Sequence, residues 1–400
     1  MLFSAWLFLG ITAFAVQDEG ELIKTNHLKP LEKNAAITHA RFRLTNEISY
    51  ISTENNVVSF VDGNKKHQFS LEAPPVCFKS DQAGNFAAVL TKSIEIQKNG
   101  GLVLHFLNNK QKRHHSVFID HVYGEQFPEL AVNNAGEILL AKTTLNRIFI
   151  FTADGHLQNQ IDLFEANDFA HERNLRIIFA PDGESFYAAA MREPARPENP
   201  GLHRNVILKK MDMRGNEDWH TFLPEQALGE LQLSSNGEKL AIYTYDAYSP
   251  AGIVKATRIF NSGGELISEL DAGFRSADFS KDGDNILFFE KREAMLYSIA
   301  TNKISATAVV QSPEMIVATI LHAANLSFTV LTGTTVFEKN EFTFQGNKLW
   351  HYSPNGSLIS QSNVPETLSE SARLLHTESP RSFILMDKNA VQIYSVGAEK

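Results

Sequence analysis

The sequence is poor in cysteine and in long apolar runs, and both absences narrow its class. Cys77 is the single cysteine among 400 residues, so no intrachain disulfide can form and a zinc site built on several cysteines is excluded. Beyond residue 15, no apolar stretch approaches the roughly 20 residues that a membrane-spanning helix requires. The sequence therefore predicts a domain held together by its apolar core, with Cys77 as a buried, inert thiol on an inner strand.

Positive charge is also scarce. The chain has 37 Lys and Arg residues against 46 Asp and Glu residues, a net charge of −9. Nucleic-acid binding needs a clustered basic face, and the densest basic run, KQKRHH (110–115), is as short as a solvated turn. Strand alternation puts His114 and His115 on opposite faces, so the two cannot hold one metal ion from a regular strand. We expect neither nucleic acid nor a metal among the ligands.

Common catalytic signatures are missing as well. The sequence contains no G-x-S-x-G nucleophile turn, no HExxH motif, no EF-hand loop, and no P-loop or GxGxxG after a strand. These are the short motifs by which hydrolases, zinc proteases, calcium sites and nucleotide sites are most readily seen in a sequence. We therefore expect a non-catalytic protein without a cofactor.

The N-terminus carries an apolar segment, MLFSAWLFLGITAFA (1–15), which ends in Ala13, Phe14 and Ala15. Small residues at these positions are typical of a signal-peptide cleavage site, and the acidic stretch VQDEGE follows at once. The segment is too short to cross a bilayer comfortably. It predicts a signal peptide over residues 1–15 and a secreted or periplasmic protein; a buried N-terminal strand or helix is the alternative.

What the sequence does contain is a repeat. Five strings share an apolar strand, a tight turn ending in glycine and a second apolar strand: CFKSDQAGNFAAV (77–89), LAVNNAGEILLAK (130–142), IIFAPDGESFYAA (177–189), LQLSSNGEKLAIY (231–243) and ADFSKDGDNILFF (277–289). Their turn glycines, Gly84, Gly136, Gly183, Gly237 and Gly283, are 52, 47, 54 and 46 residues apart. Two more short strands fit into each interval. Four strands per unit at this period are the pattern of a β-propeller blade.

Counting the units gives eight blades. Three units lack the glycine: residues 41–71, a unit that opens at residue 316 and ends near Val364, and the three strands of 372–396. Residues 20–28 can supply the missing fourth strand, so that strands from both termini close the ring and remove exposed sheet edges. The sequence thus predicts an all-β fold, a single β-propeller domain over residues 20–398 with four-stranded antiparallel blades. Seven blades is the alternative, with one weak unit as an insertion.

The repeat also carries a family resemblance. The strings FAPDGESFYAAA and FSKDGDNILFFE resemble the F-S-P-D-G repeat of WD40-like propellers of the TolB type, and LSSNGEKLAIYT is similar with Asn in place of Asp. The resemblance implies a propeller and no particular activity. The repeats take up nearly all residues, so we expect neither the extra domain of TolB nor the hydrolase domain of prolyl-oligopeptidase-like enzymes. The Gly-His and Trp-Asp pattern of eukaryotic WD40 blades is not visible.

Candidate site residues follow from the register of the repeats. The first strand of each propeller blade lines the central channel, and the residue seven positions before the turn glycine is expected at the channel mouth. These residues are Glu129, Arg176 and Glu230, and Arg275 and Arg373 occupy comparable places in other units. Arginines in this position can clamp a carboxylate, a phosphate or a peptide. The alternative is that the charges at the mouth pair with one another and bind nothing.

Enlarged loops point to the same face. The connections from second to third strand are long at residues 191–204, 245–256 and 332–347, and binding residues are often carried by such loops. If the second and third of these stretches extend the strands instead of forming loops, the candidate binding surface is smaller. The candidate loop residues are Arg196, His203, Tyr245, Tyr248 and Phe344.

The most economical hypothesis is an exported, non-catalytic propeller that binds a protein or peptide partner through this loop-rich face. The alternative is an enzyme at the channel mouth, of the lactonase, lyase or quinoprotein type. For that chemistry the first strands offer Glu129 and Glu230, but no His or Asn at the matched positions. Because one fold hosts many activities, the repeats alone do not decide between the two.

Overall fold

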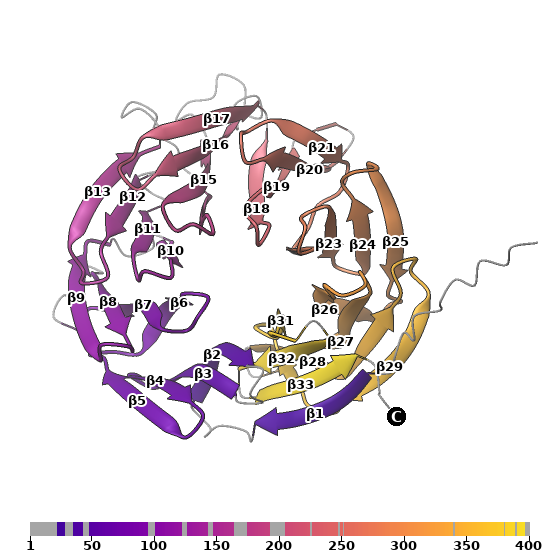
Figure 1. Ribbon diagram of the computed structural model, residues 1–400, viewed down its shortest axis with the longest axis horizontal. Coiled ribbons are helices and arrows are strands. Elements are labelled where there is room, and N and C mark those ends of the chain that lie inside the picture. Colours follow the sequence, from indigo (N-terminus) through magenta and orange to yellow (C-terminus); the bar gives the residue numbers. More distant parts are fainter. Residues whose placement is uncertain are drawn as a thin grey trace, which may run out of the picture.

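The computed structural model shows a ring of β-sheets (Figure 1). It describes residues 22–28, 35–42, 48–94, 101–121, 126–142, 147–163, 174–192, 205–224, 226–246, 249–250, 252–338, 341–379, 381–388 and 390–396. All regular secondary structure of these residues is β-strand, and they include no helix with the length and apolarity that a membrane crossing requires. The expected signal peptide, residues 1–15, and Arg196, His203 and Tyr248 lie outside the described residues.

The first four blades follow one another along the chain, each an antiparallel sheet whose first strand is innermost. Blade 1 comprises β2 (Ala35–Phe42), β3 (Ile48–Glu54), β4 (Val57–Asp62) and β5 (Lys65–Ser70). Blade 2 comprises β6 (Pro75–Ser80), β7 (Phe86–Lys92), β8 (Leu102–Asn108) and β9 (Arg113–Ile119). Blade 3 comprises β10 (Glu129–Val132), β11 (Ile138–Lys142), β12 (Arg147–Phe151) and β13 (Leu157–Asp162). Blade 4 comprises β14 (Leu175–Phe179), β15 (Ser185–Arg192), β16 (Asn205–Asp212) and β17 (Glu217–Pro224).

The remaining four blades complete the ring. Blade 5 comprises β18 (Ala227–Leu233), β19 (Lys239–Asp246), β20 (Val254–Asn261) and β21 (Leu266–Leu270). Blade 6 comprises β22 (Ser276–Phe279), β23 (Asn285–Glu290), β24 (Glu293–Ser298) and β25 (Lys303–Val309). Blade 7 comprises β26 (Glu314–Leu321), β27 (Phe328–Glu338), β28 (Glu341–Tyr352) and β29 (Leu358–Val364), with the short β30 (Leu368–Ser369) paired to β28. Blade 8 comprises β31 (Arg373–His376), β32 (Ser382–Asp387), β33 (Ala390–Val396) and β1 (Leu22–Leu28).

Ring closure agrees with the sequence prediction. The N-terminal strand β1 pairs antiparallel with β33, from Leu22 opposite Val396 to Leu28 opposite Val391, and there are eight blades, not seven. The first blade begins earlier than expected, at residue 35 instead of 41. The reason is a register shift between Ile37 and His39, which interrupts the apolar alternation of β2 and hides the strand in the sequence.

The repeat glycines shape the turns between first and second strands. All five have a positive φ, between 68° and 85°, which residues with a Cβ rarely adopt, and each N–H donates to the carbonyl three residues earlier at 2.9–3.1 Å. These turns also pack on the preceding blade. Asn133 Nδ2 in blade 3 donates to the Gly183 carbonyl of blade 4 at 3.0 Å, and a Cβ on Gly136 would lie 2.5 Å from the Phe86 ring. The repeated motif therefore builds both the hairpin and the seam between blades.

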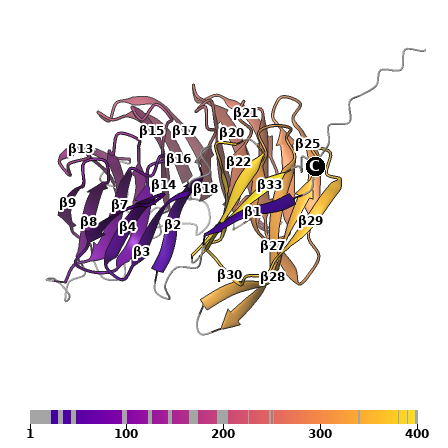
Figure 2. The same cartoon turned by 60° about the horizontal axis from the view of Figure 1, so that its bottom comes forward.

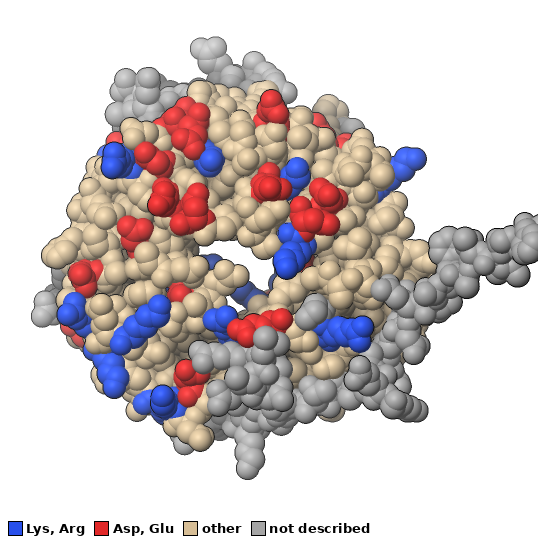
Figure 3. Space-filling view, in the orientation of Figure 1, with Lys and Arg blue, Asp and Glu red and all other residues tan. Residues whose placement is uncertain are grey.

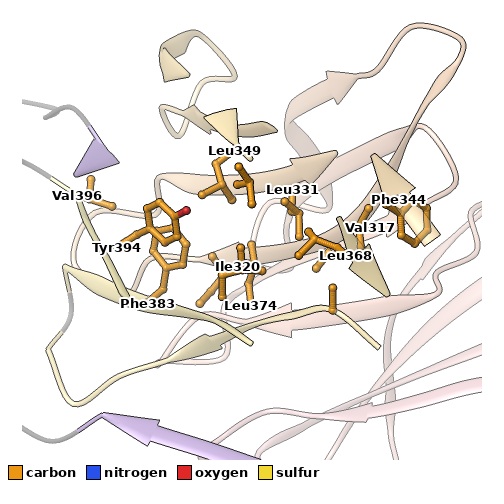
Figure 4. Packing of buried hydrophobic residues seen from close by; sticks show 14 residues of the cluster. Val317, Ile320, Leu331, Phe344, Leu349, Leu368, Leu374, Phe383, Tyr394 and Val396 are labelled. Carbon is orange, nitrogen blue, oxygen red and sulfur yellow. The ribbon is translucent and has the colours of Figure 1, made fainter. Parts of the chain in front are cut away.

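The apolar core lies mainly in these seams. Figure 4 shows the seam between blades 7 and 8, where Leu331 and Leu349 face Leu374, Phe383 and Tyr394. Full burial of each large apolar side chain stabilises the fold by about 1.5–3 kcal/mol, more than an exposed ion pair does. The closing blade is therefore held chiefly by packing.

Blade 7 carries an extension, residues 334–345, which we call the arm. Beyond Thr334 the strands β27 and β28 pair only with each other and with β30, and Figure 2 shows the resulting hairpin projecting from the ring. The alternative for residues 332–347, in which the stretch extends the strands, is confirmed, because β27 and β28 pair as far as Glu338 opposite Glu341. Phe344 is a strand residue, 4% exposed, and packs with Leu368 in the core (Figure 4).

Candidate functional site

The first strands surround a central channel of about 1440 Å³, lined by residues of blades 2 to 8. Figure 3 shows it as an opening through the ring, with both acidic and basic side chains around it. All five side chains predicted at the mouth line this channel: Glu129, Arg176, Glu230, Arg275 and Arg373. The register of the repeats thus placed them correctly on the channel wall.

The two ends of the channel differ in construction. Because strands alternate in direction, the starts of the first strands share one face with the connections from second to third strand, including the tip of the arm. We call this the mouth face and the opposite one, which carries the repeat turns, the turn face. Asp154, Asp182 and Glu184 line the channel from turns on the turn face. The predicted arginines lie at the starts of first strands, on the mouth side.

On the mouth side, three blades are joined by one arginine. Arg176 Nε and Nη2 donate to the two carboxylate oxygens of Glu230 at 3.2 and 3.3 Å, and Arg176 Nη1 lies 3.4 Å from Glu129 Oε2. Glu129, Arg176 and Glu230 belong to blades 3, 4 and 5, and all are half-buried or nearly so. We call this set the Arg176 trio. For these three residues the alternative prediction is confirmed: the charges at the mouth pair with one another.

The environment of the trio shifts its pKa values. Burial raises the pKa of Glu129, although the charges of Arg176 and Lys79 act in the opposite direction. Desolvation lowers the pKa of Arg176, but hydrogen bonds and charges from Glu230 and Glu129 outweigh it, and the net shift is upward. Arg176 therefore stays charged, and its hydrogen-bonding capacity is largely used within the trio.

The opposite half of the mouth is different. Arg275 just before β22 and Arg373 at the start of β31 are exposed on the mouth side, and Lys79, near the end of β6, is exposed on the channel wall closer to the turn face. Within the described residues, no ion pair or side-chain hydrogen bond involves these three side chains. Glu370 is the one carboxylate that lines the channel from blades 6, 7, 8 and 2 among those residues. Lys79 lies close enough to Glu129 for its charge to lower the pKa of that carboxyl, whereas Arg275 and Arg373 have only Glu370 on their side of the channel. We call Lys79, Arg275 and Arg373 the cationic half-rim.

The mouth is therefore dipolar. The Arg176 trio, centred on blade 4, carries one arginine and two carboxylates, a net charge of −1. The cationic half-rim is centred on blade 8, which lies opposite blade 4 in a ring of eight. Lys79 is the member in blade 2 and Arg275 the member in blade 6, one on each side of blade 8. An anion entering the channel is attracted towards the side of blade 8.

A second hollow of about 800 Å³ adjoins this half-rim and lies beside the arm. It shares residues of its wall with the channel, among them Lys79, Glu370 and Arg373, so the two spaces lie side by side. Phe342 and Glu341 line it from the arm, and Phe78 and Met386 line it from blades 2 and 8. We call this hollow the groove. The sequence analysis missed it, because it depends on how the arm folds.

A partly exposed charge pair also escaped the sequence analysis. His376 Nε2 lies 2.8 Å from Asp278 Oδ2, and the Leu321 N–H donates to the same oxygen at 2.9 Å, which connects blades 6, 7 and 8. Burial lowers the pKa of His376, but the Asp278 charge and hydrogen bond raise it more, so the net shift is upward. Asp278 is two residues beyond the expected mouth position of its strand, on the same side by strand alternation.

The remaining candidates have mixed outcomes. Tyr245 is half-buried in β19, with its ring 5.9 Å from that of Tyr243, so the start of the stretch 245–256 is strand. His114 Nε2 contacts His105 Nδ1 at 3.0 Å whereas His115 faces Asp154 at 3.8 Å, and the prediction that the two point to opposite faces is confirmed.

Two further observations concern metal binding and cysteine chemistry. No three His, Cys, Asp or Glu side chains in the part of the chain that the structure describes could jointly hold a metal ion. Cys77 lies in the inner strand β6, where it is half-buried, and burial raises the pKa of its thiol. A raised pKa leaves the sulfur protonated at neutral pH and poorly reactive, as expected for a core cysteine.

Comparison with known proteins identifies structures of similar fold. No protein-family model and no curated protein sequence matches the chain. Similar solved structures include the C-terminal WD40 domain of Sif2, with 12% identity, coverage of 95% of this chain and 99% of that chain, and a TM-score of 0.58. The Dos1 propeller is similar at 9% identity, 94% and 95% coverage and a TM-score of 0.59. The expected WD40-like resemblance is confirmed at the level of fold: this chain is an eight-bladed β-propeller with WD40 propellers among its structural neighbours.

Proposed function

We propose that this protein is an exported, non-catalytic propeller that binds a protein or peptide partner at its mouth face. The observation that carries the proposal is the cationic half-rim. Lys79, Arg275 and Arg373 line one side of an open channel, and no described side chain forms an ion pair or a side-chain hydrogen bond with the two arginines. Charges that fold stability does not use, at the mouth of a concave site, favour ligand binding.

The Arg176 trio supports this assignment by contrast. The same strand position yields a paired arginine in blade 4 and an unpaired one in blade 8. An unpaired guanidinium keeps its planar fork for a carboxylate supplied by a partner, the geometry in which arginine binds most strongly.

Photo-crosslinking tests the face. A photoreactive phenylalanine analogue is introduced at Arg275 on the mouth side, or at the exposed Lys281 on the turn face of the same blade as the matched control. Each protein is then irradiated in the periplasmic extract or culture fluid of its source. We expect a specific adduct from position 275 that excess unlabelled protein suppresses, and none from position 281. Adducts from position 281 alone, or from neither, would contradict the proposal.

Export is tested separately. The support for it is the sequence pattern of residues 1–15 with small residues at positions 13 and 15. We expect mass spectrometry of the protein purified from its source to find a mature chain that begins at Val16. A chain that retains residues 1–15 and fractionates with the cytoplasm would contradict export and leave the binding proposal to stand on the crosslinks.

A further inference from the structure

We propose that the arm and the groove form the docking site for an acidic, extended segment of the partner that carries a large apolar side chain. This inference rests on the proposed function and specifies its ligand. Its three supports are an apolar stripe on the arm that lacks a cover, a groove with an apolar wall, and the cationic half-rim that continues from it.

The stripe on the arm continues the protein core beyond the ring. Phe342 and Phe344 lie two residues apart on β28 and therefore on one face of the hairpin. Phe344 is 4% exposed beneath Leu368, whereas Phe342 is 49% exposed and its cross-strand partner Phe337 is 58% exposed. The two exposed rings lie 4.6 Å apart, centre to centre. Exposed aromatic side chains that adjoin the buried core, as Phe337 and Phe342 do, typically anchor a side chain of a binding partner.

The groove gives this anchor a binding site. Phe342 lines it from the arm, opposite Phe78 of blade 2 and Met386 of blade 8. Aromatic and thioether side chains make an apolar wall that can accept an aromatic or long aliphatic side chain. With a volume of about 800 Å³, the groove can hold several residues of an extended chain and is much larger than a single ion requires.

Charge specifies the rest of the segment. Lys388 at the edge of the groove is partly compensated by Glu341, whose Oε1 lies 3.8 Å from its Nζ. Lys79 and Arg373 have no such partner among the described residues, and Arg275 follows along the channel wall. The unpaired guanidinium groups of Arg275 and Arg373 call for two carboxylates beside the apolar anchor. A long polyanion such as nucleic acid fits less well, since the protein as a whole carries −9.

Selection from a library tests the chemistry without a known ligand. Randomised twelve-residue peptides are displayed on phage and selected on the intact mature chain. We expect enriched peptides to carry two or more Asp or Glu residues within a few positions of Phe, Trp or Leu. Their affinity should fall at least about 30-fold for Arg275→Glu with Arg373→Glu, and it should weaken with salt. The matched control is Lys281→Glu with Lys303→Glu, two exposed lysines away from the groove, for which we expect less than about a threefold change.

The aromatic anchor is tested in the same assay. We expect Phe337→Ala with Phe342→Ala to weaken the selected peptides about 10-fold, because two exposed anchors are removed. Phe222→Ala, an equally exposed phenylalanine on the outer strand of blade 4, should leave affinity unchanged within about twofold. Thermal melts of all variants show whether each protein is folded. If Phe337→Ala with Phe342→Ala does not fold, Arg275→Glu with Arg373→Glu still tests the proposal.

Three results would overturn the inference: no enrichment, enrichment of basic or uncharged peptides, and equal affinity for the charge-reversed protein. A dimer in size-exclusion chromatography that Phe337→Ala with Phe342→Ala converts to a monomer would assign the arm to a second copy of this chain instead. If crosslinks at position 275 persist under any of these results, the proposed function stands and only the acidic segment is wrong. If neither crosslinks at position 275 nor enriched acidic peptides are found, the proposed function is wrong as well.

Discussion

Basic residues have different roles on the two sides of the channel mouth. On the side of blade 4, Arg176 is bonded to carboxylates of both neighbouring blades. On the side of blade 8, Arg373, Arg275 and Lys79 face the channel without such bonds among the described residues. Arg176 therefore joins blades 3, 4 and 5, whereas Arg275 and Arg373 remain available to a ligand. A charged rim thus has to be divided into paired and unpaired groups before any of it is assigned to binding.

The halves of the ring also differ in their buried histidines. His105 in blade 2 and His351 in blade 7 are 1% and 0% exposed and bond to Thr91 and Thr329, so both lie on the half that contains blade 8. Burial lowers the pKa of each to about 4, from an ordinary value of 6.5. The folded state therefore holds both rings neutral. The half of the ring that we assign to binding is also the half expected to be sensitive to acid.

Acid unfolding is the largest effect that we expect. Above pH 6.5 both histidines are neutral in the folded and unfolded states. Below it the unfolded chain binds protons first, so stability falls as the pH approaches 4, by up to about 2 kcal/mol per histidine at pH 5. Urea unfolding between pH 7.5 and 4.5 measures the total, and hydrogen exchange at pH 5 should rise first in blades 7, 8, 1 and 2.

His105→Asn with His351→Asn is the control for this effect. Whatever these substitutions cost at pH 7, they should reduce the pH dependence between pH 7 and 5; part of it should remain, because burial also lowers the pKa values of His39, His114 and His322. A slope that stays as steep as that of the parent protein would mean that other groups cause the acid sensitivity and that the two histidines do not distinguish the halves.

Removal of the paired arginine should come next in size. Arg176→Met leaves Glu129 and Glu230 close together without their cation, and we expect a loss of about 1.5 kcal/mol, since the carboxylates are only partly exposed. Arg373→Met breaks no described ion pair and should change stability by less than about 0.5 kcal/mol. Equal losses of the two variants in urea unfolding would end the distinction between paired and unpaired halves.

A smaller effect sharpens the role of Glu129. Burial already raises its pKa, and without Arg176 the pKa should rise further. A carboxyl whose folded pKa exceeds its unfolded pKa favours folding at low pH and loses this contribution as the pH rises through the folded pKa. Relative to the parent protein, Arg176→Met should therefore regain stability between pH 7 and pH 5. If the difference between the two proteins is independent of pH, Glu129 does not lie beside the arginine as described.

The smallest expected effect concerns Asp278 and His376. The raised pKa of His376 means that its contribution is fully present below pH 6.5 and disappears as the pH rises above its folded pKa. We expect Asp278→Asn to lower stability by less than about 1 kcal/mol at pH 6, since the imidazole is half-exposed, and to lower it less at pH 9. Thermal melts at the two pH values measure this difference, and a larger loss at pH 9 would contradict the assigned charge state.

Most of the fold could be predicted from the sequence, because each repeat glycine marks a turn that few other residues can form. That rule located the repeat hairpins and the mouth residues of blades 3 to 5, and the count of strands correctly placed the N-terminal strand, observed as Leu22–Leu28, in the last blade. It did not locate the start of blade 1, where a register shift interrupts the pattern. Nor could it separate Arg176 from Arg373, because pairing depends on distances between blades that strand periodicity does not encode.

The arm shows the limit most clearly. The stretch TGTTVFEKNEFTFQGN (332–347), which contains the arm, lacks the repeat signature, so the sequence left both a loop and extended strands open. Alternation of Phe342 and Phe344 with polar residues was the available sign of a strand. Even with that sign, only the position of β30 explains why one phenylalanine is covered and the other is not.

The central claim is that the side of blade 8 binds and the side of blade 4 supports the ring. The most direct test measures stability and affinity for one selected acidic peptide on the same preparations of Arg373→Met and Arg176→Met. We predict that Arg373→Met loses affinity at least about fivefold with stability unchanged, whereas Arg176→Met loses stability and, where folded, keeps its affinity within about threefold. Loss of affinity in Arg176→Met with none in Arg373→Met would contradict the claim.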